Sequence, residues 1–190
     1  MILVYLYPNC ADFEIDFTLH RLHQHGGYAI RTIAATKAPL IAQSGLTFLP
    51  DACIEDITDT SDVDALLIPG GPINNDQNEI CALAKRLHDE GKLVCAICFG
   101  PQFLGRAGIL DEHAFATSCP AWRFPEYGAY DPFPRANERQ ERVVVDGNLI
   151  TAKGYAFVDF TREICRYLHV YDTADQEREM IDSVKADWVQ

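Results

Sequence analysis

The sequence predicts an α/β domain with a doubly wound, mostly parallel sheet flanked by helices. Short apolar runs alternate with amphipathic stretches along the chain, which is typical of parallel strands covered by helices on both faces. The 190 residues, with a hydrophobic share of 48%, are also sufficient for one core of this kind. Because no linker, repeat or low-complexity tract interrupts the pattern, residues 1–190 are expected to form a single domain.

The predicted strands are short apolar runs, most of them bounded by turn-forming or charged residues. In chain order they are Ile2–Tyr7, Ala29–Ala34, Ala65–Ile68, Leu93–Ile97 and Ala114–Ser118. A hairpin is expected next, formed by Arg142–Val145 and Leu149–Ala152. The residues between its strands are Asp146-Gly147-Asn148, and Asp-Gly is a common signal for a tight hairpin turn.

The predicted helices are amphipathic stretches that end near glycine, a frequent helix stop. They cover Asp12–His25, Asn75–Glu90, Pro101–Ala107 and Tyr155–Leu168. The last residues, 171–190, are charged and are predicted to form a C-terminal helical extension centred on Asp175–Val184.

Charge and cysteine content exclude several classes of protein. A formal net charge of -12 argues against nucleic-acid binding, which depends on clustered Lys and Arg. No apolar run approaches the roughly 20 residues of a membrane span, and the opening Met1–Tyr7 lacks the basic flank of a signal peptide. Seven cysteines, an odd number, fit a reducing compartment better than a disulfide framework. We therefore expect a cytoplasmic protein with no membrane or nucleic-acid partner.

The most informative segment is the end of the predicted strand Leu93–Ile97. It is followed by Cys98-Phe99-Gly100-Pro101 and then by a helix-like pattern. This order is typical of a nucleophile on a strand-to-helix turn, where a strained backbone lifts one side chain out of the strand. A cysteine at the mouth of a helix is expected to ionise more readily than a free one, and its thiolate is the nucleophilic form.

Three segments together resemble the ThiJ/PfpI superfamily, whose members share the class I glutamine amidotransferase-like, flavodoxin-like fold. They are Phe13-Glu14, Leu67-Ile68-Pro69-Gly70-Gly71 and Ala96-Ile97-Cys98-Phe99-Gly100-Pro101. The resemblance extends from the first strand to Thr151 and implies a homodimer or higher oligomer. The superfamily includes intracellular proteases, glyoxalase III-type enzymes, deglycases, isocyanide hydratases, chaperones and redox sensors, and the fold does not choose among them.

The resemblance assigns roles to four residues. Cys98 matches the nucleophile, and Glu14 matches the acidic residue that acts as its acid/base partner. The backbone N–H groups of Gly71 and Phe99 match the donors that stabilise an oxyanion. From the residues alone, Asp12 or Asp16 could also supply the acid. Gly70 and Gly71 could simply close a tight turn.

Two departures from the superfamily pattern change what the resemblance implies. The position after the nucleophile, which is His in the protease-like members, is Phe99 here, and this disfavours a peptidase. The position before Pro120, which is His in the glyoxalase and deglycase-like members, is Cys119. Proton transfer would then depend on Glu14 or on water. The hydratase-like members carry Asp instead of Glu14, which weakens the hydratase interpretation.

Cys119 and Trp122 are further pocket candidates. If Cys119 faces the nucleophile it could resolve an oxidised Cys98, although packing as a small apolar residue is the more common role of cysteine. Trp122 lies in the aromatic, proline-rich segment 120–135, a predicted loop that would either shape the pocket or anchor a surface or dimer contact. Cys95, which completes a C-x-x-C with Cys98, is expected to pack inside the strand.

The sequence therefore predicts a cofactor-independent cysteine enzyme, a hydrolase or lyase, that acts on a small reactive carbonyl or related electrophile. A glyoxalase III-like reaction is its most concrete form. The first alternative is a stress-responsive redox sensor or chaperone-like protein, and further alternatives are an isocyanide hydratase and a peptidase or amidase. No metal is expected, because no second C-x-x-C or H-x3-H follows at usable spacing.

Overall fold

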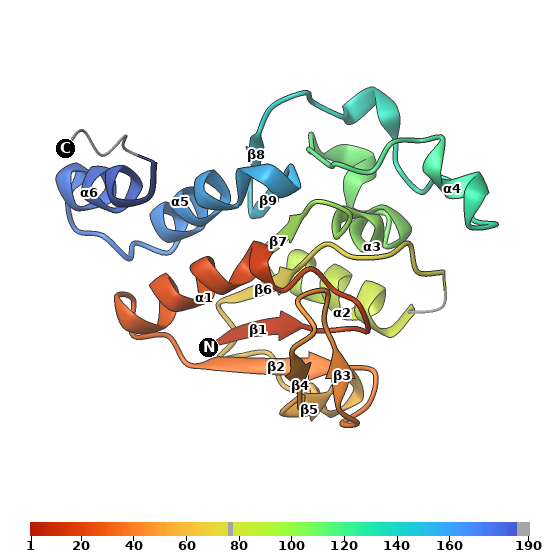
Figure 1. Cartoon of the computed structure of the whole chain (residues 1–190), viewed down its shortest axis with the longest axis horizontal. Helices are drawn as coiled ribbons and strands as arrows, with labels where there is room; N and C mark the ends of the chain where they lie inside the picture. Colours follow the sequence, from red (N-terminus) through yellow and green to blue (C-terminus); the bar gives the residue numbers. More distant parts are fainter. Residues whose placement is uncertain (76–77, 186–190) are drawn as a thin grey trace.

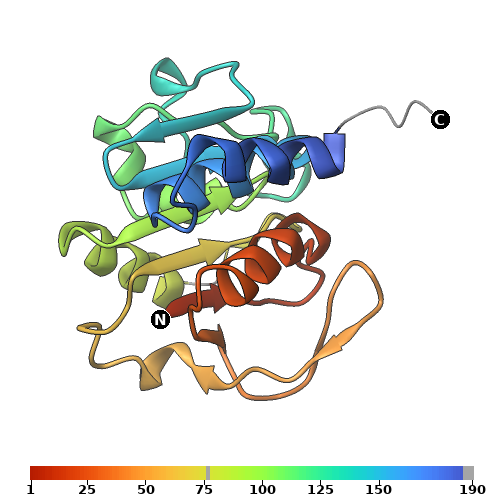
Figure 2. The same cartoon turned by 90° about the vertical axis from the view of Figure 1, so that its left-hand side faces the viewer.

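The computed structural model describes residues 1–75 and 78–185, and it places a seven-stranded sheet between two layers of helices (Figures 1 and 2). The strands are β1 (Ile2–Tyr5), β2 (Ile30–Ala34), β3 (Leu40–Ile41), β4 (Thr47–Phe48), β5 (Ala52–Cys53), β6 (Ala65–Ile68), β7 (Leu93–Ile97), β8 (Val143–Asp146) and β9 (Leu149–Ala152). The helices are α1 (Phe13–Gln24), α2 (Asn78–Asp89), α3 (Pro101–Arg106), α4 (Arg123–Glu126), α5 (Phe157–Tyr167) and α6 (Ala174–Lys185).

The central sheet has the strand order β5-β2-β1-β6-β7-β9-β8, and each neighbouring pair is parallel except β8 with β9. The predicted doubly wound, mostly parallel fold is thus confirmed. Helices α1 and α5 pack together on one face, and α2 and α3 cover the other (Figures 1 and 2). β1, β6 and β7 are buried on both faces, which explains why they appear in the sequence as continuous apolar runs.

Most predicted elements have the expected positions. The bounds of β6 and β7 match the prediction, and the hairpin of β8 and β9 pairs antiparallel with Asp146 opposite Leu149. Gly147 in its turn has a φ of 62°, a left-handed conformation that glycine adopts without strain. The predicted helix at 75–90 appears as α2, and its residues 76–77 lie outside the described part of the chain.

The prediction of a strand at Ala114–Ser118 was wrong. The segment makes only an isolated bridge between Phe115 and Glu138, because β9 already occupies the place beside β7. Its backbone groups bind side chains and loop backbone instead of a strand: the N–H of Ala114 donates to Asp146 and that of Ala116 to Thr151, while the N–H of Phe115 donates to the Asn137 carbonyl. Backbone groups of a buried segment must find partners, and here side chains and neighbouring loops supply them.

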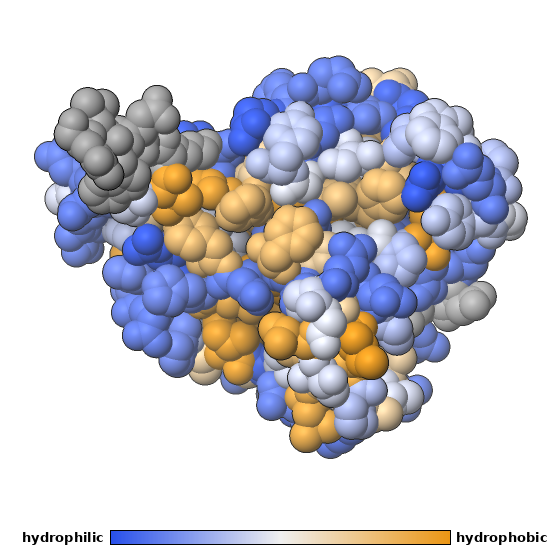
Figure 3. All heavy atoms as spheres, in the orientation of Figure 1, coloured by the Kyte–Doolittle hydropathy of each residue, from blue (hydrophilic) through white to orange (hydrophobic). Residues whose placement is uncertain are grey.

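A small hairpin, β3–β4, and the short edge strand β5 were not predicted. Each strand has only two residues, too few for an alternating pattern to stand out. Apolar side chains are exposed on this hairpin and just after it, at the lower part of the face in Figure 3. They are Ile41, Leu46 and Leu49, which are 58%, 58% and 70% exposed.

The strand topology determines where a site can form. β1, β6, β7 and β9 run parallel, so the segments that leave their carboxyl ends meet at one edge of the sheet. These segments carry Gly70 after β6, Cys98 after β7 and Gly154 after β9, while α1 follows β1. In open α/β sheets, ligands bind at this edge. No helix in the described residues is long and apolar enough to cross a membrane.

Candidate active site

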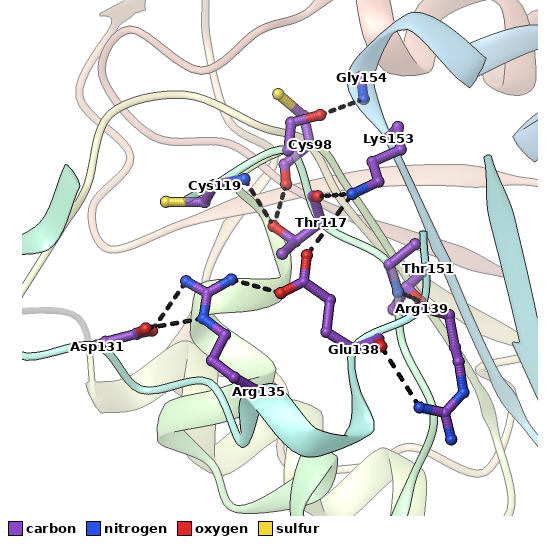
Figure 4. Close-up of polar contacts among 12 residues, drawn as sticks. Cys98, Thr117, Cys119, Asp131, Arg135, Glu138, Arg139, Thr151, Lys153 and Gly154 are labelled. Atoms are coloured by element: carbon purple, nitrogen blue, oxygen red, sulfur yellow. Dashed lines mark hydrogen bonds and ion pairs between the residues drawn. The ribbon is translucent and has the colours of Figure 1, made fainter. Parts of the chain in front are cut away.

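Cys98 occupies a sharp turn between β7 and α3. Its φ of 62° lies in the left-handed region, which is uncommon for residues other than glycine. The backbone N–H of Cys98 donates to the Ala152 carbonyl at 2.8 Å. Its carbonyl accepts the N–H of Ser118 at 2.9 Å and the hydroxyl of Thr117 at 2.6 Å (Figure 4). A strained residue persists only when its surroundings hold it, and hydrogen bonds from two segments do so here.

The turn also depends on Gly100. A Cβ atom at this position would lie 2.6 Å from the Ile68 carbonyl oxygen and 2.8 Å from that of Pro69. The chain that follows Cys98 thus packs directly against the end of β6, and a side chain at Gly100 would push the turn away from the sheet.

Glu14, the predicted acid, lies in the first turn of α1 and is only 2% exposed. Its carboxyl makes a hydrogen bond with the Cys98 thiol and accepts the N–H of Gly70 at 2.8 Å. The two other acids considered from the sequence lie elsewhere: Asp12 binds the N–H and hydroxyl of Ser44, and Asp16 is exposed. The structure therefore brings Glu14 to Cys98.

Two glycines form the walls around this pair. A Cβ on Gly70 would lie 2.5 Å from a Glu14 carboxyl oxygen and 3.1 Å from Cys98 Sγ. A Cβ on Gly154 would lie 2.6 Å from the other carboxyl oxygen and 2.9 Å from Sγ. Gly70 was predicted as a pocket residue, but Gly154 was missed. Its only sequence signal is a glycine soon after a predicted strand.

Ser118 is a second residue that sequence reasoning missed. Its hydroxyl and the backbone N–H of Phe99 both make hydrogen bonds with the Cys98 sulfur. The N–H of Gly154 donates to Ser118 Oγ at 2.9 Å, so the hydroxyl proton of Ser118 remains available for the sulfur. Ser118 is thereby oriented as a donor to a thiolate.

The protonation of the pair differs from the sequence expectation of an acidic thiol. Burial raises the pKa of Cys98 well above its ordinary value, and the charge of Glu14 and its hydrogen bond to the thiol raise it further. Hydrogen bonds from Ser118 and from the N–H of Phe99 lower it. Burial also raises the pKa of Glu14. Two adjacent acidic groups in a buried cleft resist being ionised together, so the second group of the pair loses its proton at a much higher pH than the first. Burial and the neighbouring Glu14 carboxyl thus outweigh the hydrogen bonds from Ser118 and Phe99, and the pKa of the thiol moves upward.

The pair opens into a pocket of about 540 Å³. Four predicted residues line it: Glu14, Gly71, Cys98 and Phe99. Within the described residues, the N–H of Gly71 has no hydrogen-bond acceptor, and it remains free for a ligand. The polar residues of the lining that were not predicted are Asn9, Gln43, Arg123 and Tyr127. No histidine is among the lining residues that the structure describes.

Cys119 and Trp122 are not among the residues that line this pocket. Cys119 is 1% exposed in the core, where burial raises its pKa to about 12. Figure 4 shows its side chain directed away from the Cys98 sulfur, on the side of Asp131. The two residues before Cys119 bind the Cys98 carbonyl, and this turns position 119 to the opposite side. The Trp122 side chain is 62% exposed.

A partly buried ionic chain supports the turn from behind (Figure 4). Lys153 Nζ donates to the Thr117 carbonyl at 2.6 Å and lies 3.6 Å from a Glu138 carboxyl oxygen. Arg135 in turn pairs with Glu138 and Asp131, each at 2.8 Å. Since Thr117 holds the Cys98 carbonyl, this chain positions the nucleophile without touching the pocket.

The remaining cysteines do not add to the site. Cys95 is fully buried inside β7, as its place in the apolar run predicts. All seven cysteines are free. Among the described residues, no group of three or more His, Cys, Asp or Glu side chains could hold a metal ion.

Comparison with known proteins gives consistent results. The model of the DJ-1/PfpI family matches residues 1–167. A protein of Pyrococcus abyssi named a deglycase is 31% identical over 145 residues, which cover 75% of this chain and 82% of that protein. The crystal structure of a DJ-1 superfamily protein from Agrobacterium tumefaciens has 29% identity and a TM-score of 0.79, with 94% of both chains covered. A thiJ/pfpI family protein from Bacillus anthracis, 22% identical, shares the fold with a TM-score of 0.83 over 97% of this chain and 90% of that one.

Proposed function

Because the chain belongs to the DJ-1/PfpI family, we propose that it is a Cys98-dependent enzyme acting on a small reactive carbonyl compound. One observation carries this proposal: a single carboxyl, Glu14, is held against the Cys98 sulfur in a cleft that opens into a pocket. A nucleophile paired with a proton donor is the minimum that carbonyl addition requires. Relatives named deglycases, about 30% identical, support an enzyme of this kind.

The proposed first step is addition of Cys98 Sγ to an aldehyde carbon. The Glu14 carboxylate takes the proton of the Cys98 thiol as the S–C bond forms, the electron pair of the C=O bond moves to oxygen, and Glu14 then passes the same proton to that oxygen. While negative charge develops there, the N–H of Gly71 can stabilise it, and so can the N–H of Phe99 once the sulfur that it binds has formed the S–C bond; one such donor contributes about 3 kcal/mol in enzymes where it was removed. Glu14 is left as a carboxylate beside the new hemithioacetal.

A glyoxalase III-like conversion of methylglyoxal follows from the same two groups. Glu14 removes the proton from the carbon that carries sulfur, the electrons move to the ketone oxygen, and an enediol forms. Return of the proton to the neighbouring carbon gives a thioester, and water then cleaves the S–C bond to release lactate and the thiol. The sum is methylglyoxal plus water to lactate, so the reaction needs no redox cofactor and no histidine.

The test is lactate formation from methylglyoxal by the wild type, Cys98→Ala and Cys119→Ala. We expect turnover in the wild type, a loss of roughly 10³-fold or more in Cys98→Ala, and little change in Cys119→Ala. No turnover by the wild type, or turnover that survives in Cys98→Ala, would overturn the proposal. Reversible oxidation of Cys98 without any turnover would instead favour the redox alternative considered from the sequence.

The predicted homodimer remains a proposal as well. The exposed apolar side chains of the β3–β4 hairpin region, Ile41, Leu46 and Leu49, support a contact with a second copy (Figure 3). Sedimentation equilibrium of the wild type and of Leu46→Glu measures it directly. We expect the variant to shift the mass toward the monomer, whereas an unchanged mass would place any interface elsewhere.

A further inference from the structure

The pocket that holds Cys98 contains a cation that neither the thiol nor Glu14 requires. Arg123, from the short helix α4, lines this pocket together with Cys98. Asn9 and Gln43 add neutral amide groups to the same lining, and Glu14 is the carboxyl that belongs to the reaction. A neutral carbonyl compound needs no cation for binding, so Arg123 calls for a separate explanation.

The guanidinium of Arg123 has weak partners within the protein. Its Nη1 lies 3.8 Å from a carboxyl oxygen of Glu126, and its Nη2 lies 3.5 Å from the Tyr127 hydroxyl. Its Nε is buried and has no hydrogen-bond partner among the described residues. Five N–H donors therefore make two long contacts, and a buried donor left unpaired is costly. Among the residues that the structure describes, the guanidinium is therefore short of acceptors.

Nearby aromatic rings hold the guanidinium in place. The Arg123 guanidinium carbon lies 5.8 Å from the ring centroid of Trp122 and 5.6 Å from that of Tyr127. Such contacts attract a cation but do not use its in-plane donors. They reduce the freedom that the side chain would lose on binding a ligand, and they leave its fork of N–H groups available.

We propose that Arg123 selects substrates that carry a carboxylate, so that the preferred carbonyl compounds of this enzyme are small anionic ones. A guanidinium binds a carboxylate through two parallel hydrogen bonds, a geometry that a neutral substrate cannot satisfy. The pocket of about 540 Å³ has room for such a group beyond the carbonyl that meets Cys98. The chain has a formal net charge of -12, so a local cation in the pocket is needed to favour anions there. This inference rests on the proposed carbonyl chemistry at Cys98.

Two alkylating reagents of the same size test the proposal. Iodoacetate and iodoacetamide both form an S–C bond at Cys98 as iodide leaves, but only iodoacetate carries a carboxylate. The measured quantity is the ratio of their rate constants at Cys98, resolved by peptide mass spectrometry and divided by the same ratio for N-acetylcysteine. We expect a normalised ratio of at least about fivefold in the wild type, falling to about one in Arg123→Gln. The iodoacetamide rate reports on the integrity of each variant.

Arg178→Gln is the matched control, because it removes one positive charge from α6, where the Arg178 side chain is 69% exposed. It should leave the normalised ratio at the wild-type value. A ratio near one in the wild type, or equal losses in both variants, would overturn the proposal, since either result means that no local anion site faces Cys98.

A second measurement separates this inference from the reactivity of Cys98. Binding of pyruvate to Cys98→Ala, followed by calorimetry, should weaken at least about fivefold when Arg123→Gln is added. If Cys98 is alkylated by neither reagent, the proposed function fails while pyruvate binding still decides the role of Arg123. Identical pyruvate affinity with and without Arg123 would overturn the anion site, whatever Cys98 does.

Discussion

The two ends of the central sheet hold similar titratable groups and use them differently. At the carboxyl ends of the strands, Cys98 has a strained backbone and opens with Glu14 into a pocket. At the opposite end, the His88 and His113 rings meet edge to face at 4.9 Å, and His113 lies 3.4 Å from Asp146. The two ends therefore differ in the open space and the strained backbone beside the titratable groups, and not in the presence of such groups.

The glycines at the two ends of the sheet have different surroundings. At the site, Gly70 and Gly154 leave space that the Cys98 sulfur and the Glu14 carboxyl fill. At the opposite end, Gly147 has nothing within 4 Å of its would-be Cβ and serves only the hairpin turn. There, the Asn148 side chain donates to the carbonyls of His88 and Lys92 and ties the end of α2 to β9. The end with Cys98 thus depends on the space beside its glycines, whereas the opposite end is held together by side-chain hydrogen bonds.

The largest expected effect is that of Glu14→Gln on turnover. Loss of the acid/base group should lower kcat/KM for the carbonyl substrate about 10²- to 10⁴-fold. The same change should speed alkylation of Cys98 by iodoacetamide near neutral pH, because the Glu14 charge raises the pKa of the thiol. Opposite shifts in the two rates would show that the pair acts as one unit. Slower alkylation would contradict the assigned electrostatics.

Gly154→Ala tests whether open space defines the site. Its Cβ would lie 2.6 Å from a Glu14 carboxyl oxygen, so the pair must move, and turnover should fall about 10²-fold. Gly147→Ala is the control at the other end: its φ of 62° should cost about 1 kcal/mol of unfolding free energy and leave turnover unchanged. Equal turnover in Gly154→Ala and Gly147→Ala would show that the space at Gly154 is not required for the reaction.

Lys153→Met tests the ionic chain behind the turn. The Lys153 side chain is only 11% exposed, and its loss leaves the Thr117 carbonyl without this donor. We expect the free energy of unfolding in urea to fall by about 3 kcal/mol, as when one partner of a buried pair is removed. Lys85→Met breaks an exposed pair with Asp89 and should cost less than about 0.5 kcal/mol. Similar costs would mean that the chain does not support the turn.

The smallest expected effect is the pH response of His88. Burial, with the neighbouring His113, lowers its pKa below the ordinary 6.5. The unfolded chain then binds this proton more readily, so the stability contributed by the neutral ring is present above pH 6.5 and is lost as pH falls through the lowered pKa. His88→Phe should therefore lose less unfolding free energy than the wild type between about pH 7.5 and about pH 5. An identical loss of unfolding free energy in the variant and the wild type would show that His88 does not contribute to the pH dependence of stability.

The amino-acid sequence by itself determined the elements that local signals encode. The apolar runs of β6 and β7, the Asp-Gly turn of the hairpin and the order Ile97-Cys98-Phe99-Gly100-Pro101 predicted the sheet and the turn, because each is a property of neighbouring residues. The resemblance to known proteins added Glu14, which no local pattern around Cys98 could have identified.

Only the tertiary structure decided the surroundings of Cys98. Ser118 and Gly154 contact Cys98 from segments far apart in the chain, Arg123 lines the same pocket, and no periodicity marks any of the three. For the same reason, the sequence could not determine the direction in which the pKa of Cys98 moves. Burial and Glu14 raise it, hydrogen bonds from Ser118 and from the N–H of Phe99 lower it, and the balance depends on how closely the folded chain brings these groups together.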